Sequence, residues 1–417
     1  MKWNKLGRGT LASILSLALV SVTACSRDYV LAYVYVTTAT PLNSAQSQNG
    51  GVSAYAVDFQ IGSLTPLADS PVEAGRKPVT LVASPNGLNL YVVNHDDSTV
   101  GEYAIGTDGK IFLQNTYNVT GSGATSIAID AAGAFLYVTF TYQLGPNGQQ
   151  LYSPASPGPG GVTIFPINKD GSLAAASTLK VGNNPVGVVV SRPRPNSSVV
   201  YAYVLDQEVA PKATVLGFLQ NATTGALTPI PGTVITTDST GKTIATGYGA
   251  GTTPSAIAED PSARFVYITD EATNQLYGNL VSNNGVLVAM TNGPFGTGIF
   301  PVGVTIDPRG NFLYVANLSS STVSAYAIDT ATGTPVGSIG SAMTATDTSP
   351  TCVAIEPALG IYLYTSNNLA SDVSAMQLDP HNGGLKQVQN TPFPSGGLPT
   401  CAVAVANGSH PTQIIVP

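Results

Sequence analysis

Seven short strand motifs, each built around a tyrosine, recur along the 417-residue chain. They are Tyr35-Val36, Tyr91-Val92, Tyr137-Val138, Tyr203-Val204, Tyr267-Ile268, Tyr314-Val315 and Tyr364-Thr365. Successive motifs lie between 46 and 66 residues apart, and strand-like segments fill the intervals. A repeat of this size that contains only strand-like pieces is typical of propeller blades. The sequence therefore predicts an all-β fold, a single seven-bladed β-propeller.

Each repeat contains four strand patterns. An apolar run comes first and is opened by proline in most repeats, as in Pro301-Val302-Gly303-Val304. Proline is tolerated there because the ladder does not yet need its missing N–H. A turn rich in proline, glycine and asparagine then leads to the tyrosine strand. A third strand alternates small and aromatic residues, as from Val323 to Tyr326, and a fourth opens with Gly-x-Leu, as in Gly62-Ser63-Leu64. Four antiparallel strands form one blade.

The chain does not begin and end at the same point of the repeat. The first repeat starts on a second strand, at Tyr35, and the last ends on a first strand, from Cys401 to Val405. We therefore expect the C-terminal strand to pair with the N-terminal blade and close the ring, which removes exposed sheet edges. The alternative is an open array, which would need a capping repeat at each end.

The N-terminal residues predict export. Lys2, Lys5 and Arg8 precede an apolar stretch that is too short to span a bilayer comfortably. The following Val22-Thr23-Ala24-Cys25 resembles the lipobox of bacterial lipoproteins. This resemblance implies a signal peptide over residues 1–24, a lipid on Cys25, a tether over 25–28 and one domain over 29–417. We expect a cell-envelope lipoprotein, periplasmic or anchored to the outer membrane; an ordinary secretory signal is the alternative.

Charge and motifs exclude several kinds of partner. The formal net charge is −7 and no basic stripe is present, which argues against nucleic acid. The sequence contains no Asp-x-Asp-x-Asp-Gly loop, His-x-x-x-His spacing, phosphate loop or Cys-x-x-Cys. These motifs are the usual signs of metal and cofactor sites. We therefore expect no metal and no cofactor.

Two cysteines besides Cys25 occur in identical Pro-Thr-Cys contexts, at Cys352 and Cys401. They occupy equivalent positions in neighbouring blades, and an exported protein permits a disulfide. Adjacent inner strands can diverge beyond the ~7 Å Cα separation that a disulfide allows. Two buried free thiols are therefore the favoured expectation, with a disulfide as the alternative.

The tyrosine strand Tyr314-Val315-Ala316-Asn317 resembles the YVTN-type propellers. The fourth-strand pattern Gly225-Ala226-Leu227-Thr228-Pro229 resembles the seven-bladed lactonase family, which includes 6-phosphogluconolactonases and carboxymuconate-lactonising enzymes. In that family an Arg-His or His pair often enters a first strand after proline. The matching positions here are Ser255 and Ala256. An acidic residue after the tyrosine strand, a family feature, is present as Glu271.

The predicted topology gathers polar residues at one mouth of the channel. First and second strands are antiparallel, so the start of the first and the end of the second share a face. The residues placed there are Lys77, His95, Asp96, Asp97, Asp206, Glu208, Asp270, Glu271, Asn317, Asn367 and Asn368. The long insertions 38–51, 143–161 and 236–253 reach the same face. By the same argument Arg192 and Arg194 face the opposite side.

Two functions fit these residues, and a purely structural role in the cell envelope is the third alternative. The missing Arg-His pair favours a module that binds a small molecule, glycan or protein at a rim of Lys77, Asp96, Asp206, Glu208, Asn317 and Asn367. The alternative is a lactone hydrolase, in which Asp270 or Glu271 is the base and His95 carries a proton. The 95–97 and 270–271 segments could also be plain solvated loops.

Overall fold

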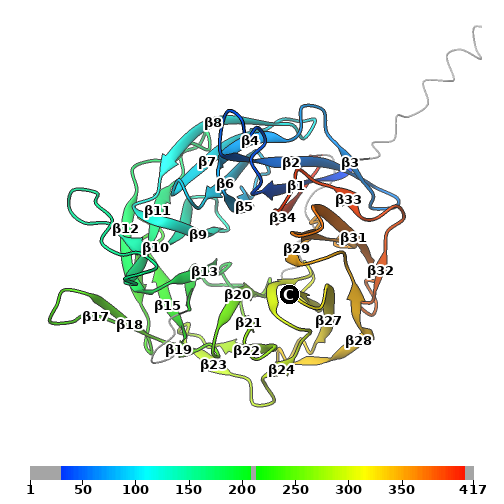
Figure 1. Cartoon of the computed structure of the whole chain (residues 1–417). Helices are drawn as coiled ribbons and strands as arrows, with labels where there is room; N and C mark the ends of the chain where they lie inside the picture. The colour runs from blue at the N-terminus through cyan, green and yellow to red at the C-terminus, as the bar shows by residue number, and fades with distance from the viewer. Residues whose placement is uncertain (1–29, 208–212, 409–417) are drawn as a thin grey trace, which may run out of the picture.

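A computed structural model describes residues 30–207 and 213–408. Within these residues every regular element is a β-strand, and the strands form seven radial sheets around a central channel (Figure 1). Each sheet has a four-stranded antiparallel core, and four sheets carry one extra short strand. The predicted all-β, seven-bladed propeller is therefore confirmed.

Apart from β34, which belongs to blade 1, the strands of the first four blades lie between residues 30 and 249. Blade 1 contains β34 (Pro399–Ala406), β1 (Val30–Thr38), β2 (Asn49–Asp58), β3 (Leu64–Pro66) and the added β4 (Val72–Arg76). Blade 2 contains β5 (Pro78–Ala83), β6 (Asn89–Asn94), β7 (Thr99–Ile105) and β8 (Ile111–Asn118). Blade 3 contains β9 (Gly121–Ile129), β10 (Phe135–Gln143), β11 (Pro159–Pro166) and β12 (Ser177–Asn183). Blade 4 contains β13 (Pro185–Val190), β14 (Tyr201–Asp206), β15 (Thr214–Gln220), β16 (Leu227–Pro229) and the added β19 (Tyr248–Gly249).

The remaining blades complete the circle. Blade 5 contains β20 (Pro254–Glu259), β21 (Phe265–Asp270), β22 (Gln275–Val281), β23 (Leu287–Ala289) and the added β24 (Phe295–Gly296). Blade 6 contains β25 (Pro301–Ile306), β26 (Phe312–Asn317), β27 (Thr322–Ile328) and β28 (Pro335–Ala345). Blade 7 contains β29 (Pro350–Ile355), β30 (Tyr362–Asn367), β31 (Asp372–Leu378), β32 (Leu385–Gln387) and the added β33 (Phe393–Pro394). A separate hairpin of β17 (Val234–Thr237) and β18 (Thr243–Thr246) projects from the rim (Figure 1).

The C-terminal strand closes the ring, as the phase of the repeat predicts. β34 pairs antiparallel with β1 along its length, from Ala32 opposite Ala406 to Thr38 opposite Pro399. β1 lies between β34 and β2, so blade 1 is built from both ends of the described chain. The first blade therefore has no unpaired inner edge on β1, and the alternative of an open array is excluded.

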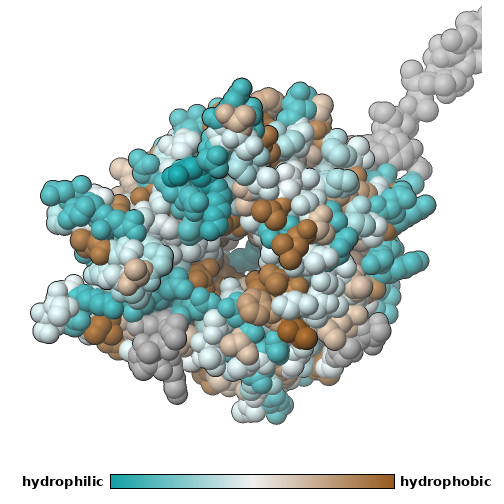
Figure 2. All heavy atoms as spheres, viewed as in Figure 1, coloured by the Kyte–Doolittle hydropathy of each residue, from teal (hydrophilic) through white to brown (hydrophobic). Residues whose placement is uncertain are grey.

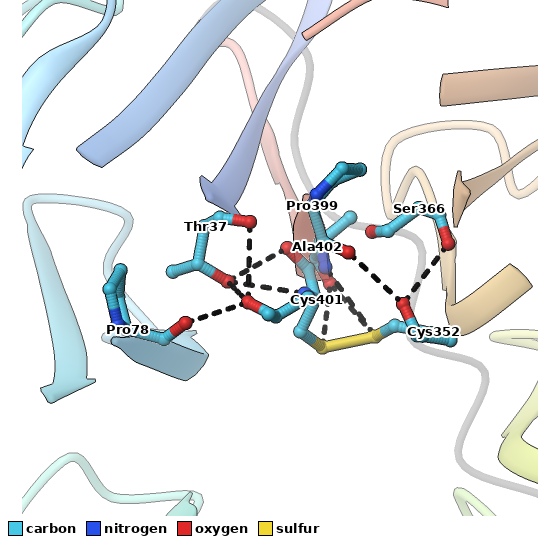
Figure 3. Close-up of a disulfide and its surroundings, with 9 residues drawn as sticks. Thr37, Pro78, Cys352, Ser366, Pro399, Cys401 and Ala402 are labelled. Carbon is cyan, nitrogen blue, oxygen red and sulfur yellow. Dashed lines mark hydrogen bonds between the residues drawn. A yellow bond between two sulfur atoms is a disulfide. The ribbon is translucent and has the colours of Figure 1, made fainter. Parts of the chain in front are cut away.

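A covalent bond reinforces this closure. Cys352 of β29 and Cys401 of β34 form a disulfide with a Cα–Cα separation of 4.9 Å (Figure 3). The expectation of free thiols is therefore wrong, because the inner strands of blades 7 and 1 stay within bonding reach at this level of the channel. On the other side, Thr400 Oγ1 donates to the carbonyl of Pro78 in blade 2 at 2.8 Å. The closing strand is thus held to both neighbouring blades.

The recurring tyrosines join each blade to the next. All seven are fully buried, and each hydroxyl donates to a glycine carbonyl in the turn between the third and fourth strands of the following blade, at 2.5 to 3.0 Å. The pairs are Tyr35 with Gly109, Tyr91 with Gly171, Tyr137 with Gly225, Tyr203 with Gly285, Tyr267 with Gly333, Tyr314 with Gly383 and Tyr364 with Gly62. The motif therefore forms a continuous circle of blade-to-blade bonds.

Tyr314→Phe tests the energetic contribution of one bond in this circle. The substitution keeps the ring but leaves the buried Gly383 carbonyl without its donor, which should cost about 1–3 kcal/mol of unfolding free energy. Denaturant unfolding measures the change. Tyr201→Phe is the matched control, because its hydroxyl also donates to a carbonyl, that of Asn283, but at an exposed site. Equal losses in the two variants would contradict a special role for the buried circle.

Candidate functional site

The channel has two mouths that differ in how their side chains are used. We define the loop-side mouth as the end where Pro78, Pro254 and Pro301 begin first strands and the loops after the second strands lie. The turn-side mouth is the opposite end, where first strands end, for example at Ala83 and Glu259. Figure 2 shows the opening at the centre of the ring, with hydrophobic residues gathered around part of it.

Most acidic and amide residues predicted for the loop-side mouth brace the fold. Asp270 is fully buried, and its carboxylate accepts the N–H groups of Thr252 at 2.6 Å, Thr253 at 3.1 Å and Ala272 at 3.0 Å. Asn317 accepts from Gly298 N–H and donates to the hydroxyls of Thr322 and Ser324. Asp270 and Asn317 are each the last residue of a second strand. Their side chains form these hydrogen bonds within their own blades.

Asn367 and Asp206 occupy the same strand-end position in blades 7 and 4, and both are fully buried. Asn367 donates to Asp372 at 2.7 Å and to Ser374 at 2.8 Å. Glu208 and Cys25 lie outside the described residues. Asp270, Asn317 and Asn367 therefore lie at the strand ends that the topology predicts, and their side chains are hydrogen-bonded within their blades.

The other loop-side candidates are accessible but far apart along the ring. His95 Nδ1 lies 2.7 Å from Asp96 Oδ1, and both side chains are partly exposed. Lys77 is exposed, and its carbonyl accepts the N–H of His95. Glu271 is half-buried; burial and the neighbouring Asp270 raise its pKa. Because His95 follows β6 in blade 2 and Glu271 follows β21 in blade 5, the structure does not bring them together.

Hydroxyl groups at the loop-side mouth form hydrogen bonds between neighbouring blades. Ser255 Oγ donates to the Pro301 carbonyl of the next blade at 2.6 Å, and Thr125 Oγ1 makes the same bond to Pro185 at 2.7 Å. Ser255 holds the position at which lactonase-like proteins often carry a basic residue. Here that position joins blades 5 and 6.

The turn-side mouth is hollowed by two adjoining cavities of about 560 and 530 Å³. We call the first the blade 1 lobe, because it is bordered by Val403–Gly408 of β34 and its C-terminal end, and by the turn 84–87. We call the second the channel lobe, because it extends past Ile257, Glu259 and Ile306 into the channel. The residues common to both lobes are Val82, Ile129, Val190, Arg192 and Pro357. Each cavity is large enough for a small organic ligand.

Glu259 is the ionisable residue at the end of a first strand in the channel lobe. The corresponding residues in blades 4 and 6 are Val190 and Ile306. Burial raises the pKa of Glu259 to about 8, with a smaller contribution from the neighbouring Asp260 carboxyl; the hydroxyl of Ser191 opposes the shift. Ser191 Oγ donates to Glu259 Oε1 at 2.6 Å. The site thus holds one oriented carboxyl group that ionises near pH 8.

Arg192 supplies the positive charge at the same mouth and borders both lobes. The residue is exposed overall, but partial desolvation by the surrounding protein lowers the pKa of its guanidinium, and Glu259 raises it; an arginine stays charged in either case. The guanidiniums of Arg76, Arg194, Arg264 and Arg309 are all hydrogen-bonded to protein oxygens. Among the described residues, Arg192 is the arginine whose guanidinium makes no hydrogen bond to the protein. It is therefore available to a ligand.

Sequence reasoning placed Arg192 on this face but missed Glu259. The signal was available, because a glutamate replaces an aliphatic residue at the end of the apolar run Pro254–Glu259. The aspartates of the adjoining turns are structural. Asp260, for example, accepts the N–H groups of Ser262, Arg264 and Phe265.

In residues 30–207 and 213–408, no group of three or more His, Cys, Asp and Glu side chains is arranged to hold a metal ion. That same part of the chain contains no helix that could cross a membrane.

Comparison with known proteins agrees with this architecture. The family described as "Lactonase, 7-bladed beta-propeller" matches residues 33–196 and 194–355, well over half of the chain. A Bacteroides fragilis structure described as "a putative 6-phosphogluconolactonase" superposes with a TM-score of 0.67 at 19% identity, covering 91% of this chain and 99% of that one. The Pseudomonas aeruginosa periplasmic gluconolactonase PpgL superposes with a TM-score of 0.64 at 20% identity, covering 90% and 99%.

The search of curated proteins gave no match. At these identities the solved structures establish the shared fold alone. The family match runs from within β1 of blade 1 to residue 355, the end of β29 in blade 7. The chain therefore belongs to the seven-bladed β-propeller lactonase family.

Proposed function

We propose that the protein hydrolyses a small, uncharged lactone at the turn-side mouth of the channel. The observation that carries the proposal is the pair formed in one cavity by Glu259, whose carboxyl group is oriented by Ser191, and Arg192, whose guanidinium makes no hydrogen bond to the protein. Membership of the lactonase family supports this reaction class. The proposal favours hydrolysis over the ligand-binding module that the sequence suggested first.

The reaction follows from the charges of these two groups. Ionised Glu259 removes a proton from a water molecule while the water oxygen forms a bond to the lactone carbonyl carbon. The negative charge that develops on the carbonyl oxygen is stabilised by Arg192. The tetrahedral species then collapses, the ring C–O bond breaks, and the proton on Glu259 passes to the departing alkoxide. The product is the open hydroxy acid. Ser191 acts as a positioning residue, because it fixes one carboxyl oxygen of Glu259.

The charge balance of the site favours an uncharged substrate. The residues that border the two lobes include one cation, Arg192, and the acids Asp130, Glu259 and Asp260. A phosphate ester would place a dianion beside these acids, and like charges in a partly desolvated cavity repel. We therefore expect little turnover of 6-phosphogluconolactone.

The pH profile tests the role of Glu259. A general base works when ionised, and the pKa of Glu259 is about 8. The enzymatic kcat/KM, after subtraction of spontaneous hydrolysis, should therefore rise with pH and level off above about pH 8. A pH-stat assay with γ-butyrolactone and glucono-δ-lactone measures it. A profile that is already flat from pH 5 upwards would contradict Glu259 as the base.

We also propose, from the lipobox alone, that a lipid on Cys25 holds the protein at the bacterial cell envelope. Cys25 lies five residues before the start of β1 at Val30. This tether would leave the propeller outside the cytoplasm, where the disulfide between Cys352 and Cys401 can persist.

A further inference from the structure

The blade 1 lobe adds binding space beside the reacting groups of the channel lobe. Val82 and Val190 border both lobes and therefore lie at their junction. Arg192 also borders both, so a molecule held by Arg192 can extend into either lobe. A simple lactone ring fills only part of this combined space.

The side chains of the blade 1 lobe are largely aliphatic. They include Val82, Ala83, Ile129, Val403 and Ala404. Its wall on one side is β34, whose residues alternate between alanine and valine from Ala402 to Ala406. Such a surface offers dispersion contacts and removal of apolar area from water.

Ser84 and Asp130, two of the polar residues that border the lobe, are hydrogen-bonded to the protein. Ser84 Oγ bonds to Asn86 Oδ1 at 2.6 Å. The Asp130 carboxylate accepts the N–H groups of Ala134 and Phe135 and the amide of Gln220. These groups form the turns between first and second strands. What remains for a ligand is Arg192, the amide nitrogen of Asn86, the aliphatic surface and the main chain.

Resting on the proposed function, we infer that the substrate is a lactone with an unbranched alkyl or acyl arm. The ring lies in the channel lobe between Glu259 and Arg192, and the arm passes Val82 and Val190 into the blade 1 lobe. An arm built of methylene groups suits this lobe better than a phosphorylated or polyhydroxylated one. Hydroxyl groups would lose water there and find few free side-chain partners.

A chain-length series tests the assignment. The full mature chain is assayed with γ-butyrolactone, γ-octalactone and γ-decalactone, with glucono-δ-lactone as the hydroxylated comparison. Burial of each methylene group should raise kcat/KM about threefold to fourfold until the lobe is filled. Val82→Phe, which narrows the junction, should abolish both the gain of γ-octalactone and the gain of γ-decalactone over γ-butyrolactone. Val302→Phe, on β25 near the loop-side mouth, is the matched control and should change neither.

Binding of γ-lactams with the same arms, which are not hydrolysed, separates the two proposals. Calorimetry should show affinity that rises with arm length and falls in Val82→Phe, while thermal melting checks that this variant folds. If all lactones are hydrolysed but kcat/KM does not depend on arm length, or if glucono-δ-lactone is the best substrate, the inference of an alkyl or acyl arm is wrong. The proposed hydrolase activity is then still supported. If no lactone is hydrolysed, the proposed hydrolase activity is wrong. Lactam binding then shows whether the blade 1 lobe binds alkyl arms. If lactam affinity does not depend on arm length, the proposed alkyl-binding role of the lobe is wrong as well.

Discussion

Deleting residues 398–417 should leave a protein that does not form a stable ring. The deletion removes β34, which pairs with β1 from Ala32 to Thr38 and forms the inner strand of blade 1. It also removes Cys401 and with it the disulfide to β29. A disulfide alone typically stabilises by about 2–4 kcal/mol. The total loss is therefore on the order of the 5–15 kcal/mol by which a typical domain is stable.

The deletion also uncovers a strand edge that can pair with other chains. β1 loses its inner partner, and the apolar side chains of blade 1 that pack on blade 7, such as Leu31 and Val34, lose their cover. Exposed strand edges promote association between molecules. We expect aggregation on size-exclusion chromatography and rapid proteolysis. Truncation after Gly408, which keeps β34 whole, is the control; if the longer deletion melts like the parent, closure by β34 does not stabilise the ring.

The repeated tyrosines made the fold predictable from sequence. Each tyrosine fills one position of a repeated contact, a hydroxyl bonded to a glycine carbonyl of the next blade, so its spacing reports the blade repeat directly. The phase of the repeat predicted the pairing of β34 with β1 for the same reason. Local sequence patterns were sufficient to predict the fold because every blade makes the same contacts with the next blade.

The functional site was harder to predict, because a polar residue at a strand end can either bind a ligand or form hydrogen bonds within its own blade. Asp270 and Asn317 look like rim residues in a sequence, yet both turn back and satisfy main-chain N–H groups of their own blade. Glu259 looks like part of an apolar strand, yet it faces a cavity. The disulfide escaped a firm prediction because it depends on a Cα separation of 4.9 Å between two blades. Such separations follow from how the ring closes, which no local pattern encodes.

Glu259→Gln should reduce kcat/KM for γ-butyrolactone by about 10²–10⁴-fold, the usual contribution of a general base. The amide keeps the size of the side chain and can still accept the Ser191 hydroxyl, but it cannot remove a proton from water. Arg192→Gln should cost about 10²–10³-fold, because the developing oxyanion loses its charged donor. Initial rates in a pH-stat at pH 8.5 measure both losses.

Stability measurements show whether Glu259→Gln acts on chemistry or on folding. The pKa of Glu259 is raised in the folded protein from an ordinary value of 4.5 to about 8, so the folded state binds the extra proton. Its contribution therefore lowers the free energy of unfolding as pH rises from about 4.5 to 8. Glutamine does not ionise, so Glu259→Gln should equal the parent near pH 4 and exceed it in stability at pH 9. If the variant is more stable than the parent and yet inactive, its loss of activity comes from the missing general base and not from unfolding.

The same substitution at the opposite mouth decides between the two ends of the channel. Burial and Asp270 raise the pKa of Glu271 as well, and Glu271 is the base that the sequence suggested. Glu271→Gln should leave kcat/KM within about twofold of the parent if the reaction takes place beside Arg192. Loss of turnover in Glu271→Gln with full activity in Glu259→Gln would instead place the reaction at the loop-side mouth. Because the two glutamates belong to one blade and sit at opposite ends of the channel, no single local disturbance can produce both results.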